Sequence, residues 1–366
     1  MPDSATIMRV LQTLWVSDYA PRKILDRLIR TIDYSRRNPV CRRFPRQVHA
    51  EIVHGCNLKC IMCPVPRTAD KVSLMAPETF SAVVEQLKGK IEVLVLHSDG
   101  EPLLSPHVTD FVRLATRNNI KTMLSTNCTL LNARRSRELI NAGLGHIVLA
   151  VDGVTKKTYE QIRVGASFER VMDNVHTFFR LKKQKRASNP FVTMQFVKMP
   201  ENEHEANAFL STWSAFDCVP LVKPATNLLS PNSEIIANHP YCHRLWHTLL
   251  VTPDGTILPC VANHFSCRFP LGKVLSEKIE IAWNSERLQF LRREIVRGRR
   301  HSPMCRNCNV TPIRPENRME LLRSVLFDSG SYLKIAAVLG YQRPAQTFTP
   351  SGREPPRHSV HSPSAG

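Results

Sequence analysis

Three cysteines lie close together in the stretch CNLKCIMCP at 56–64, where Cys56, Cys60 and Cys63 are spaced as CxxxCxxC. An iron–sulfur cube has four corners and a tetrahedral zinc site takes four ligands, so three thiolates on one tight loop leave one position open. No fourth cysteine and no His-x₃-His pair follows within the next forty residues. The loop therefore fits either a [4Fe–4S] cube with one free iron or a zinc site that borrows a distant ligand such as His54.

A second cysteine set lies towards the C-terminus. Cys242 and Cys260 flank a segment in which PDG predicts a hairpin turn between two short strands. Cys305 and Cys308 follow as CRNC, after forty-four intervening residues. Four thiolates can enclose a [4Fe–4S] cube completely or hold one structural zinc ion, and the spacing alone leaves both open.

The composition is that of an ordinary globular protein, with 42% hydrophobic and 22% charged residues among 366. No run of eighteen apolar residues predicts a membrane span, and the N-terminus lacks the pattern of an export signal. We therefore expect a cytoplasmic protein. In that compartment eleven cysteines are better explained as metal ligands or catalytic thiols than as disulfides.

The chain is strongly basic, with a net charge of +19 from 50 Lys and Arg against 31 Asp and Glu. Such an excess suits nucleic acid, a membrane surface or an anionic substrate. The charge is diffuse and no basic strip interleaved with aromatic residues is present, which disfavours nucleic-acid binding. Two explanations stay open: an anionic group on a small substrate, and generally basic surfaces of a protein from an Arg-rich proteome.

The cysteine loop is positioned by an alternation of strand and helix patterns that begins at residue 47. The predicted strands are 47–55, 91–98, 121–127, 146–153, 191–199 and 218–225, and amphipathic helices fall between them. Six strand–helix units predict a parallel α/β domain, too short for a closed eight-stranded barrel. We expect a partial (β/α)6 TIM-like barrel with a small C-terminal cysteine-rich metal-cluster domain.

Four regions are expected along the chain. Residues 1–46 form a basic helical extension, 47–227 the partial barrel, 228–325 the cluster domain and 326–366 a tail that is mostly disordered from about 343. In the extension, a helix over 21–37 carries Ile24, Leu25, Leu28, Ile29 and Ile32 on one face. We expect this helix to pack on the main domain rather than on a membrane surface.

The order of these features resembles the radical S-adenosylmethionine (radical SAM) superfamily, which carries CxxxCxxC after the first strand of a partial barrel. The resemblance implies that SAM chelates the fourth iron of the three-cysteine cluster and is cleaved to a 5′-deoxyadenosyl radical, which abstracts hydrogen from a substrate C–H bond. It covers roughly residues 47–312. Met62 departs from the family, where most members carry an aromatic residue that packs near the adenine.

Further segments resemble SAM-contacting parts of that family. SDGEP at 98–102 resembles the GGEP motif that contacts the SAM amino group, and Glu101 there suits an ammonium partner. STN at 125–127, AVDG at 150–153 and the stretch around Arg163 resemble segments that contact its ribose and carboxylate. The implied cofactor-binding residues are Ser98, Asp99, Gly100, Glu101, Pro102, Ser125, Asn127, Asp152 and Arg163.

The C-terminal cysteine region resembles the SPASM/twitch domain of the same superfamily. The resemblance implies one auxiliary [4Fe–4S] cluster held by Cys242, Cys260, Cys305 and Cys308, in the shorter twitch-like arrangement. Among the four cysteines left over, Cys128 and Cys267 are the candidate hydrogen donors, because radical epimerases need a thiol. Cys128 stands where the family usually has glycine, and Cys267 follows a cluster ligand by seven residues.

The sequence therefore predicts a radical SAM enzyme with two [4Fe–4S] clusters, supplied with electrons by an external donor such as flavodoxin or ferredoxin. The leading expectation is two-electron oxidation (dehydrogenation) of a sugar, aminocyclitol or other small polar metabolite. The alternatives are a radical epimerase with a cysteine donor, a peptide-modifying maturase, and a non-enzyme zinc protein that binds nucleic acid. Neither the substrate nor the oligomeric state is evident from the residues.

Overall fold

Six parallel strands form the centre of the molecule. The computed structural model describes residues 21–65, 71–225, 242–261, 269–298, 301–302, 304–305 and 308. The six are β1 (Gln47–Ala50), β4 (Val93–Val95), β5 (Lys121–Thr126), β6 (His146–Ala150), β7 (Phe191–Lys198) and β8 (Val219–Pro224). They pair in parallel in chain order, and among the described strands β8 pairs only with β7. The predicted partial barrel is therefore confirmed.

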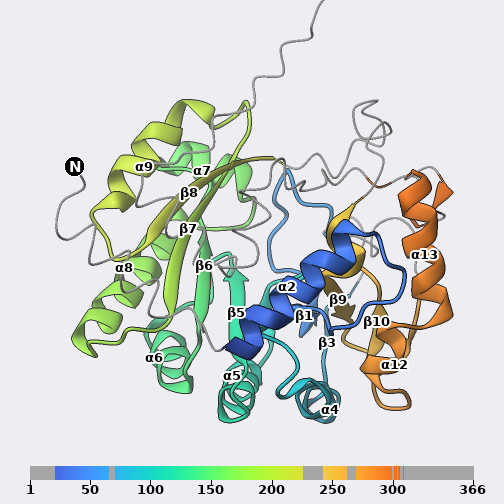
Figure 1. Cartoon of the computed structure of the whole chain (residues 1–366). Helices are drawn as coiled ribbons and strands as arrows, with labels where there is room; N and C mark the ends of the chain where they lie inside the picture. Colours follow the sequence, from blue (N-terminus) through green and yellow to red (C-terminus); the bar gives the residue numbers. More distant parts are fainter. Residues whose placement is uncertain are drawn as a thin grey trace, which may run out of the picture.

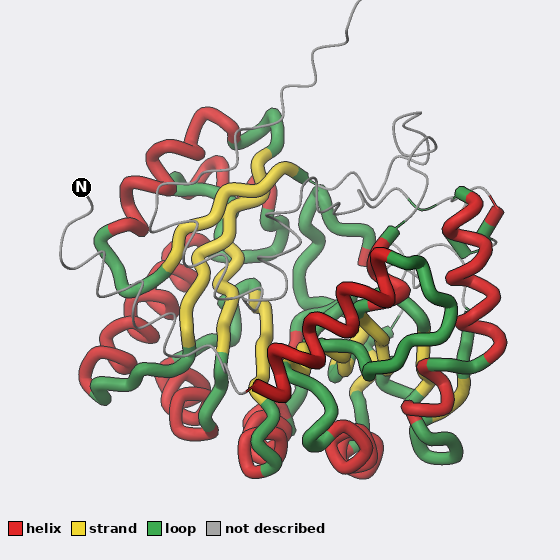
Figure 2. Tube along the Cα trace, viewed as in Figure 1, coloured by secondary structure: helices red, strands yellow, loops and turns green. Residues whose placement is uncertain are grey.

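Helices follow the strands and cover the outer side of the curved sheet (Figures 1 and 2). They are α4 (Pro77–Leu87), α5 (Val108–Arg117), α6 (Ala133–Ala142), α7 (Lys156–Ile162), α8 (Phe168–Gln184) and α9 (Ala206–Ser214). Short 3₁₀ turns occur at η1 (Pro102–Leu104) and η2 (Glu203–Glu205). Gly143 ends α6 in a left-handed conformation that glycine adopts without strain, and the short helix α7 was not anticipated.

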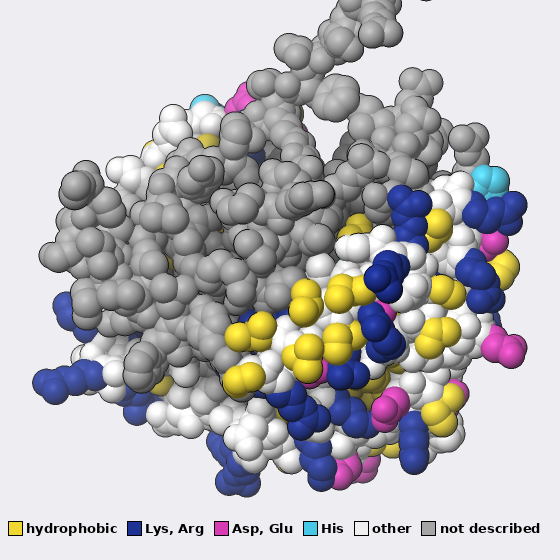
Figure 3. Space-filling model, viewed as in Figure 1, with side chains coloured by type: hydrophobic (Ala, Val, Ile, Leu, Met, Phe, Trp, Pro, Cys, Tyr) yellow, Lys and Arg dark blue, Asp and Glu magenta, His cyan; other side chains and the backbone are white. Residues whose placement is uncertain are grey.

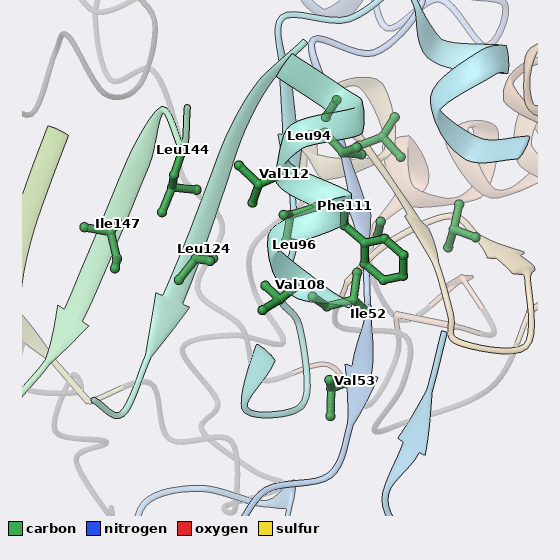
Figure 4. Packing of buried hydrophobic residues seen from close by; sticks show 14 of the residues in the cluster. Ile52, Val53, Leu94, Leu96, Val108, Phe111, Val112, Leu124, Leu144 and Ile147 are labelled. Atoms are coloured by element: carbon green, nitrogen blue, oxygen red, sulfur yellow. The ribbon is translucent and has the colours of Figure 1, made fainter. Parts of the chain in front are cut away.

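The outer side of the sheet contains the main hydrophobic core. Alternate strand residues, among them Leu94, Leu124 and Ile147, are fully buried against the helices. Figure 4 shows these side chains beside Val108 and Phe111 of α5. Burial of such side chains contributes about 1.5–3 kcal/mol each, which fixes the outer side of each strand and leaves the alternate residues on the inner side.

The C-terminal cysteine region extends the same sheet. β9 (Thr248–Val251) pairs in parallel with β1, and the antiparallel strands β10 (Thr256–Leu258) and β11 (Gly272–Lys273) complete a nine-stranded sheet. The turn between β9 and β10 is the predicted hairpin. η3 (His243–Trp246), α12 (Ile279–Trp283) and α13 (Glu286–Arg297) surround it. A separate ribbon of β2 (Val53–His54) and β3 (Ser73–Leu74) flanks the three-cysteine loop.

The N-terminal helix α2 (Pro21–Ser35) lies across the sheet on the side of β1 (Figure 1). It packs through its polar face, in which Arg27, Arg30 and Asp33 are buried, while Leu25 and Leu28 are 51% and 44% exposed. The helix was predicted and packs on the main domain as expected, although it does so through its polar face and not through its apolar face. The reason is Glu92, a buried carboxylate that attracts the two arginines.

Several expectations lie outside the described residues. These are the first helix of the N-terminal extension, the disordered tail and Cys267. Within the part of the chain that the structure describes, no helix is both long and apolar enough to span a membrane.

Candidate functional site

The three-cysteine loop lies at the carboxyl ends of the parallel strands. Gly55, just before it, donates its N–H to the Asp99 carbonyl at 2.9 Å and accepts from the Glu101 N–H at 3.0 Å. Further along, Lys59 and Ile61 donate their N–H groups to the carbonyls of Val164 and Ile162 at 2.9 and 3.1 Å. The loop is therefore tied by its backbone to both the SDGEP segment and the segment around Arg163.

Cys56 is approached by the end of β5. The Asn127 side-chain amide lies 3.6 Å from the Cys56 Sγ atom and donates to the Asn57 side-chain oxygen at 3.0 Å. Asn57 in turn donates to the Thr129 hydroxyl at 2.9 Å, and this hydroxyl donates to Asn127 at 2.7 Å. Asn127 thus lies beside the loop, and its predicted role in binding SAM stays a prediction. Asn57 and Thr129 were missed.

Cys60 contacts a buried ion pair. Arg163 donates to Asp152 Oδ2 through Nε at 2.7 Å and Nη2 at 2.6 Å, and its Nη1 atom lies 3.8 Å from Cys60 Sγ. Burial opposes the charged guanidinium, but the negative charge of Asp152 outweighs this and raises the pKa of Arg163. The other Asp152 oxygen accepts the Val197 N–H at 2.7 Å, which links the pair to β7.

The three thiols lie within electrostatic range of one another. Burial raises the pKa of Cys63 to about 11, and the neighbouring Cys60 and Cys56 thiolates add to this shift. Burial also raises the pKa of Cys56 and of Cys60. Thiolates held together in a half-buried site need a cation to balance them, as iron in a cluster does. Met62 packs beside them against Ile162 and Val197.

The SDGEP segment is built around a glycine that admits no side chain. A Cβ atom at Gly100 would lie 2.3 Å from the Val53 carbonyl oxygen and 2.7 Å from that of Gly55. The buried Glu101 carboxylate accepts from the N–H groups of Leu103 and Asn127 and from the Thr126 hydroxyl, at 3.0, 2.7 and 2.8 Å. Burial raises its pKa. Glu101 therefore connects β4 to β5, and each of its oxygens already has a donor.

The remaining residues predicted to bind SAM lie nearby. Asp99 is buried, and its N–H donates to Glu51 Oε1 at 3.0 Å, an oxygen that also lies 3.1 Å from His54 Nδ1. Ser98 is half-buried after β4, Pro102 begins η1, and Ser125 donates its N–H to His97 Nδ1 at 3.0 Å. His54 thus pairs with Glu51 next to the loop.

The second set of cysteines also comes together. Cys242, Cys260 and Cys305 are buried, and the Cys308 N–H donates to the Cys305 carbonyl at 3.0 Å. Burial raises the pKa of Cys305 to about 12, and the charges of the other three contribute. No disulfide joins the cysteines among the described residues. Two thiols that flank the β9–β10 hairpin and two from the turn at Cys305 and Cys308 suit a closed four-ligand site.

Cys128, the candidate hydrogen donor, does not face the inner side of the sheet. It is fully buried in the main core, its Sγ atom donates to the Thr126 carbonyl at 3.6 Å, and burial raises its pKa strongly. Its φ of 66° explains why glycine suits this position. A thiol without exposed surface is poorly placed to reach a substrate.

The inner side of the sheet carries polar residues that the sequence analysis did not single out. His49, His97 and His146 lie there, and burial lowers the pKa of His97 to about 3 and of His49 to about 4. Lys223 is the last residue but one of β8 and pairs in register with Val197. It is close enough to Asp152 and Arg163 to be influenced by their charges. The sequence contained a signal for Lys223. In the predicted strand 218–225 it shares one side with Val219 and Leu221, which places a cation near the carboxyl end of that strand.

Comparison with known proteins agrees with this geometry. The radical SAM superfamily model matches residues 50–212, and the model of an iron–sulfur cluster-binding domain, SPASM, matches residues 242–309. The two matches contain the two cysteine sets. The chain belongs to the radical SAM superfamily. Its radical SAM and SPASM domains imply SAM and two [4Fe–4S] clusters as cofactors, and the zinc interpretation of the cysteines is set aside.

Individual relatives match parts of this radical SAM protein. A PqqA peptide cyclase of Gluconobacter oxydans is 35% identical over 120 residues, 32% of this chain and 33% of that protein. The subtilosin biosynthesis protein AlbA of Bacillus subtilis is 24% identical over 290 residues, 66% of this chain and 60% of that protein. The chain thus aligns with less than two thirds of each relative.

The fold is shared with solved radical SAM structures. That of BtrN in complex with AdoMet and 2-DOIA has a TM-score of 0.51 and 17% sequence identity, and the match covers 76% of this chain and 98% of that one. Three thiols at the strand ends, of which Cys60 is buried and the other two half-buried, and four more in the SPASM domain fit the two implied clusters. Cys56, Cys60 and Cys63 would hold the cluster with an open iron, and the SPASM cysteines the closed one.

Proposed function

We propose that this radical SAM enzyme oxidises a small polar substrate that carries an anionic group, removing two hydrogens from it. The observation that carries the proposal is Lys223. Its side chain is exposed, and no hydrogen bond or ion pair joins its ammonium group to any described residue. An unpaired cation at the carboxyl ends of the strands would bind a carboxylate or phosphate.

The electrostatics of the inner side support a negative substrate group. Desolvation lowers the pKa of Lys223, and the charges of Asp152 and Arg163 nearly balance each other. His97 and His49 are neutral at physiological pH because burial lowers the pKa of both side chains. Among these residues, Lys223 therefore carries the positive charge that no neighbouring negative charge balances, and an incoming ligand would meet it.

When bound, SAM and the SPASM cluster would supply the radical chemistry: together they would accept one hydrogen atom and one electron from the substrate, and the remaining proton would pass to solvent. An external donor of the flavodoxin or ferredoxin class replaces the electron consumed in SAM cleavage. The residues of this chain hold the cysteine loop in place and orient the substrate. The Arg163–Asp152 pair fixes the cysteine loop against β7, and Lys223 would hold the substrate.

Peptide modification is the second candidate, favoured by the names of the relatives PqqA peptide cyclase and AlbA. Epimerisation with a cysteine donor is less favoured because Cys128 is buried in the core. We place the enzyme in the cytoplasm, where SAM and small electron donors are available.

The test uses anaerobically reconstituted enzyme with a chemical reductant and a panel of phosphorylated sugars, uronic acids, neutral aminocyclitols and short peptides. Mass spectrometry follows formation of 5′-deoxyadenosine and loss of two hydrogens from the substrate. We expect turnover of an anionic small molecule, with a KM raised at least tenfold in Lys223→Met and partly restored in Lys223→Arg. Turnover of peptides alone, or deuterium uptake from heavy water without oxidation, would contradict the proposal.

A further inference from the structure

The outward side of α2 is an apolar surface on an otherwise basic part of the chain. We define the α2 apolar face as Ile24, Leu25, Leu28, Ile29 and Ile32. Leu25 and Leu28 are exposed and the other three are half-buried. Figure 3 shows hydrophobic side chains gathered over α2, with lysine and arginine side chains around them. An exposed apolar patch of this kind marks an interaction surface.

The orientation of α2 is fixed by strong polar contacts on its other side. Arg27 donates to both Glu92 oxygens, with Nε at 2.9 Å from Oε1 and Nη2 at 2.6 Å from Oε2. Arg46 Nε lies 3.1 Å from the same carboxylate, and Arg30 donates to the Phe44 carbonyl at 2.6 Å. Rotating the helix to bury its apolar face would leave Glu92 buried without its partners, which is strongly unfavourable.

The charges around the α2 apolar face have one sign. Residues 21–46 contain nine lysines and arginines against two aspartates. Both aspartates are paired: Asp26 with Arg43 at 2.6 Å and Asp33 with Arg42 at 2.8 Å. Arg22 and Arg36, at the two ends of the helix, are exposed, and no hydrogen bond or ion pair joins the guanidinium group of either to another described residue.

We propose that the α2 apolar face docks the protein on an anionic lipid surface. An amphipathic helix with cations beside its apolar side lies in the plane of the lipid headgroups, with its apolar residues at the acyl boundary. Anionic headgroups would neutralise Arg22 and Arg36, and each cation near such a surface strengthens binding. A second copy of the chain would instead bring the same cations together, which opposes association through this face.

The competing occupants are a second copy and residues 1–20, which precede α2 directly and lie outside the described residues. The experiment uses the full chain, anaerobically reconstituted, with vesicles of neutral phosphatidylcholine or of phosphatidylcholine mixed with phosphatidylglycerol. Co-sedimentation measures binding at low and high salt. We expect binding to the anionic vesicles only, weakened by salt and reduced at least tenfold in Leu25→Glu/Leu28→Glu.

The matched control is Leu275→Glu/Ile281→Glu, which changes two residues that are 66% and 57% exposed in the SPASM region and should bind as wild type does. An unchanged iron content shows that the variants are folded. Equal binding of wild type and Leu25→Glu/Leu28→Glu, or binding to neutral vesicles, would overturn the proposal. So would a lipid-free dimer that the same variant dissociates, or vesicle binding seen only after deletion of residues 1–20.

Discussion

The Nη1 atom of Arg163 lies 3.8 Å from the Sγ atom of Cys60, so a buried guanidinium stands beside the second cysteine of the three-cysteine loop. The same guanidinium holds Asp152 at 2.6 Å. This connects the first strand's cysteine loop to the ends of β6 and β7, because Asp152 also accepts the Val197 N–H. The charge of a thiolate cluster and the position of the loop thus depend on one side chain.

Replacement of Arg163 by methionine should strongly destabilise the protein. Asp152 is fully buried, and removal of one partner from a buried ion pair costs about 3–5 kcal/mol because the other charge remains buried. Thermal unfolding followed by circular dichroism measures the effect. Arg113→Met is the control, since its pair with Asp110 is exposed and should matter little. Equal stability of the two variants would contradict the role assigned to Arg163.

Removal of either cysteine set should halve the iron content without emptying the other site. Cys56→Ala/Cys60→Ala/Cys63→Ala and Cys305→Ala/Cys308→Ala should each retain about four irons per chain, against about eight in the wild type. Only the first variant should lose SAM cleavage, because only that set leaves an iron open. Iron analysis and 5′-deoxyadenosine formation measure this. Loss of all iron from either variant would show that the two sites depend on each other.

Gly100→Ala should be far more damaging than Gly89→Ala. At Gly100 the new Cβ would meet two carbonyl oxygens at 2.3 and 2.7 Å, and backbone atoms cannot move aside as a flexible side chain can. Overpacking typically costs about 1–3 kcal/mol, and we expect at least the upper end here. At Gly89 nothing lies within 4 Å, and the cost comes only from its φ of +71°. The two melting temperatures give the comparison, and a similar loss in both would refute it.

Stability should fall as the pH drops from 6.5 towards 4. Burial lowers the pKa of His97 to about 3 and of His49 to about 4, below the ordinary value of 6.5. Between pH 6.5 and 4 the unfolded chain therefore binds protons at these histidines that the folded protein does not bind. The free energy of unfolding should fall by up to about 1.4 kcal/mol per pH unit for each histidine. His97→Asn, whose amide oxygen can accept the Ser125 N–H, should reduce the slope. Urea unfolding at several pH values measures the dependence of the free energy of unfolding on pH. Replacement of the exposed His204 by asparagine is the control.

Cys128 should resist alkylation in the folded protein. It has no exposed surface and burial raises its pKa, so little thiolate is available to react. The half-buried Cys218 is the internal comparison and should be labelled first by iodoacetamide under anaerobic conditions. Peptide mass spectrometry before and after denaturation gives the rates. Rapid native labelling of Cys128 would reopen its candidacy as a hydrogen donor.

Much of the fold was predictable because its signals are local. The spacing of Cys56, Cys60 and Cys63 is a property of one loop, and the strand and helix patterns depend on which side chains alternate within a short segment. The same holds for Gly143 at the end of α6 and for the hairpin turn before Cys260. Such features need no knowledge of distant contacts.

By itself, then, the sequence determined the parallel strand–helix order and the two cysteine sets. The tertiary structure decided which way α2 faces, because Glu92 lies far along the chain and its buried charge outweighs the local apolar pattern. It also decided that Cys128 belongs to the core, and that Lys223 lies near Asp152 and Arg163. These outcomes depend on burial and charge shared between distant segments, and only the folded chain brings those segments together.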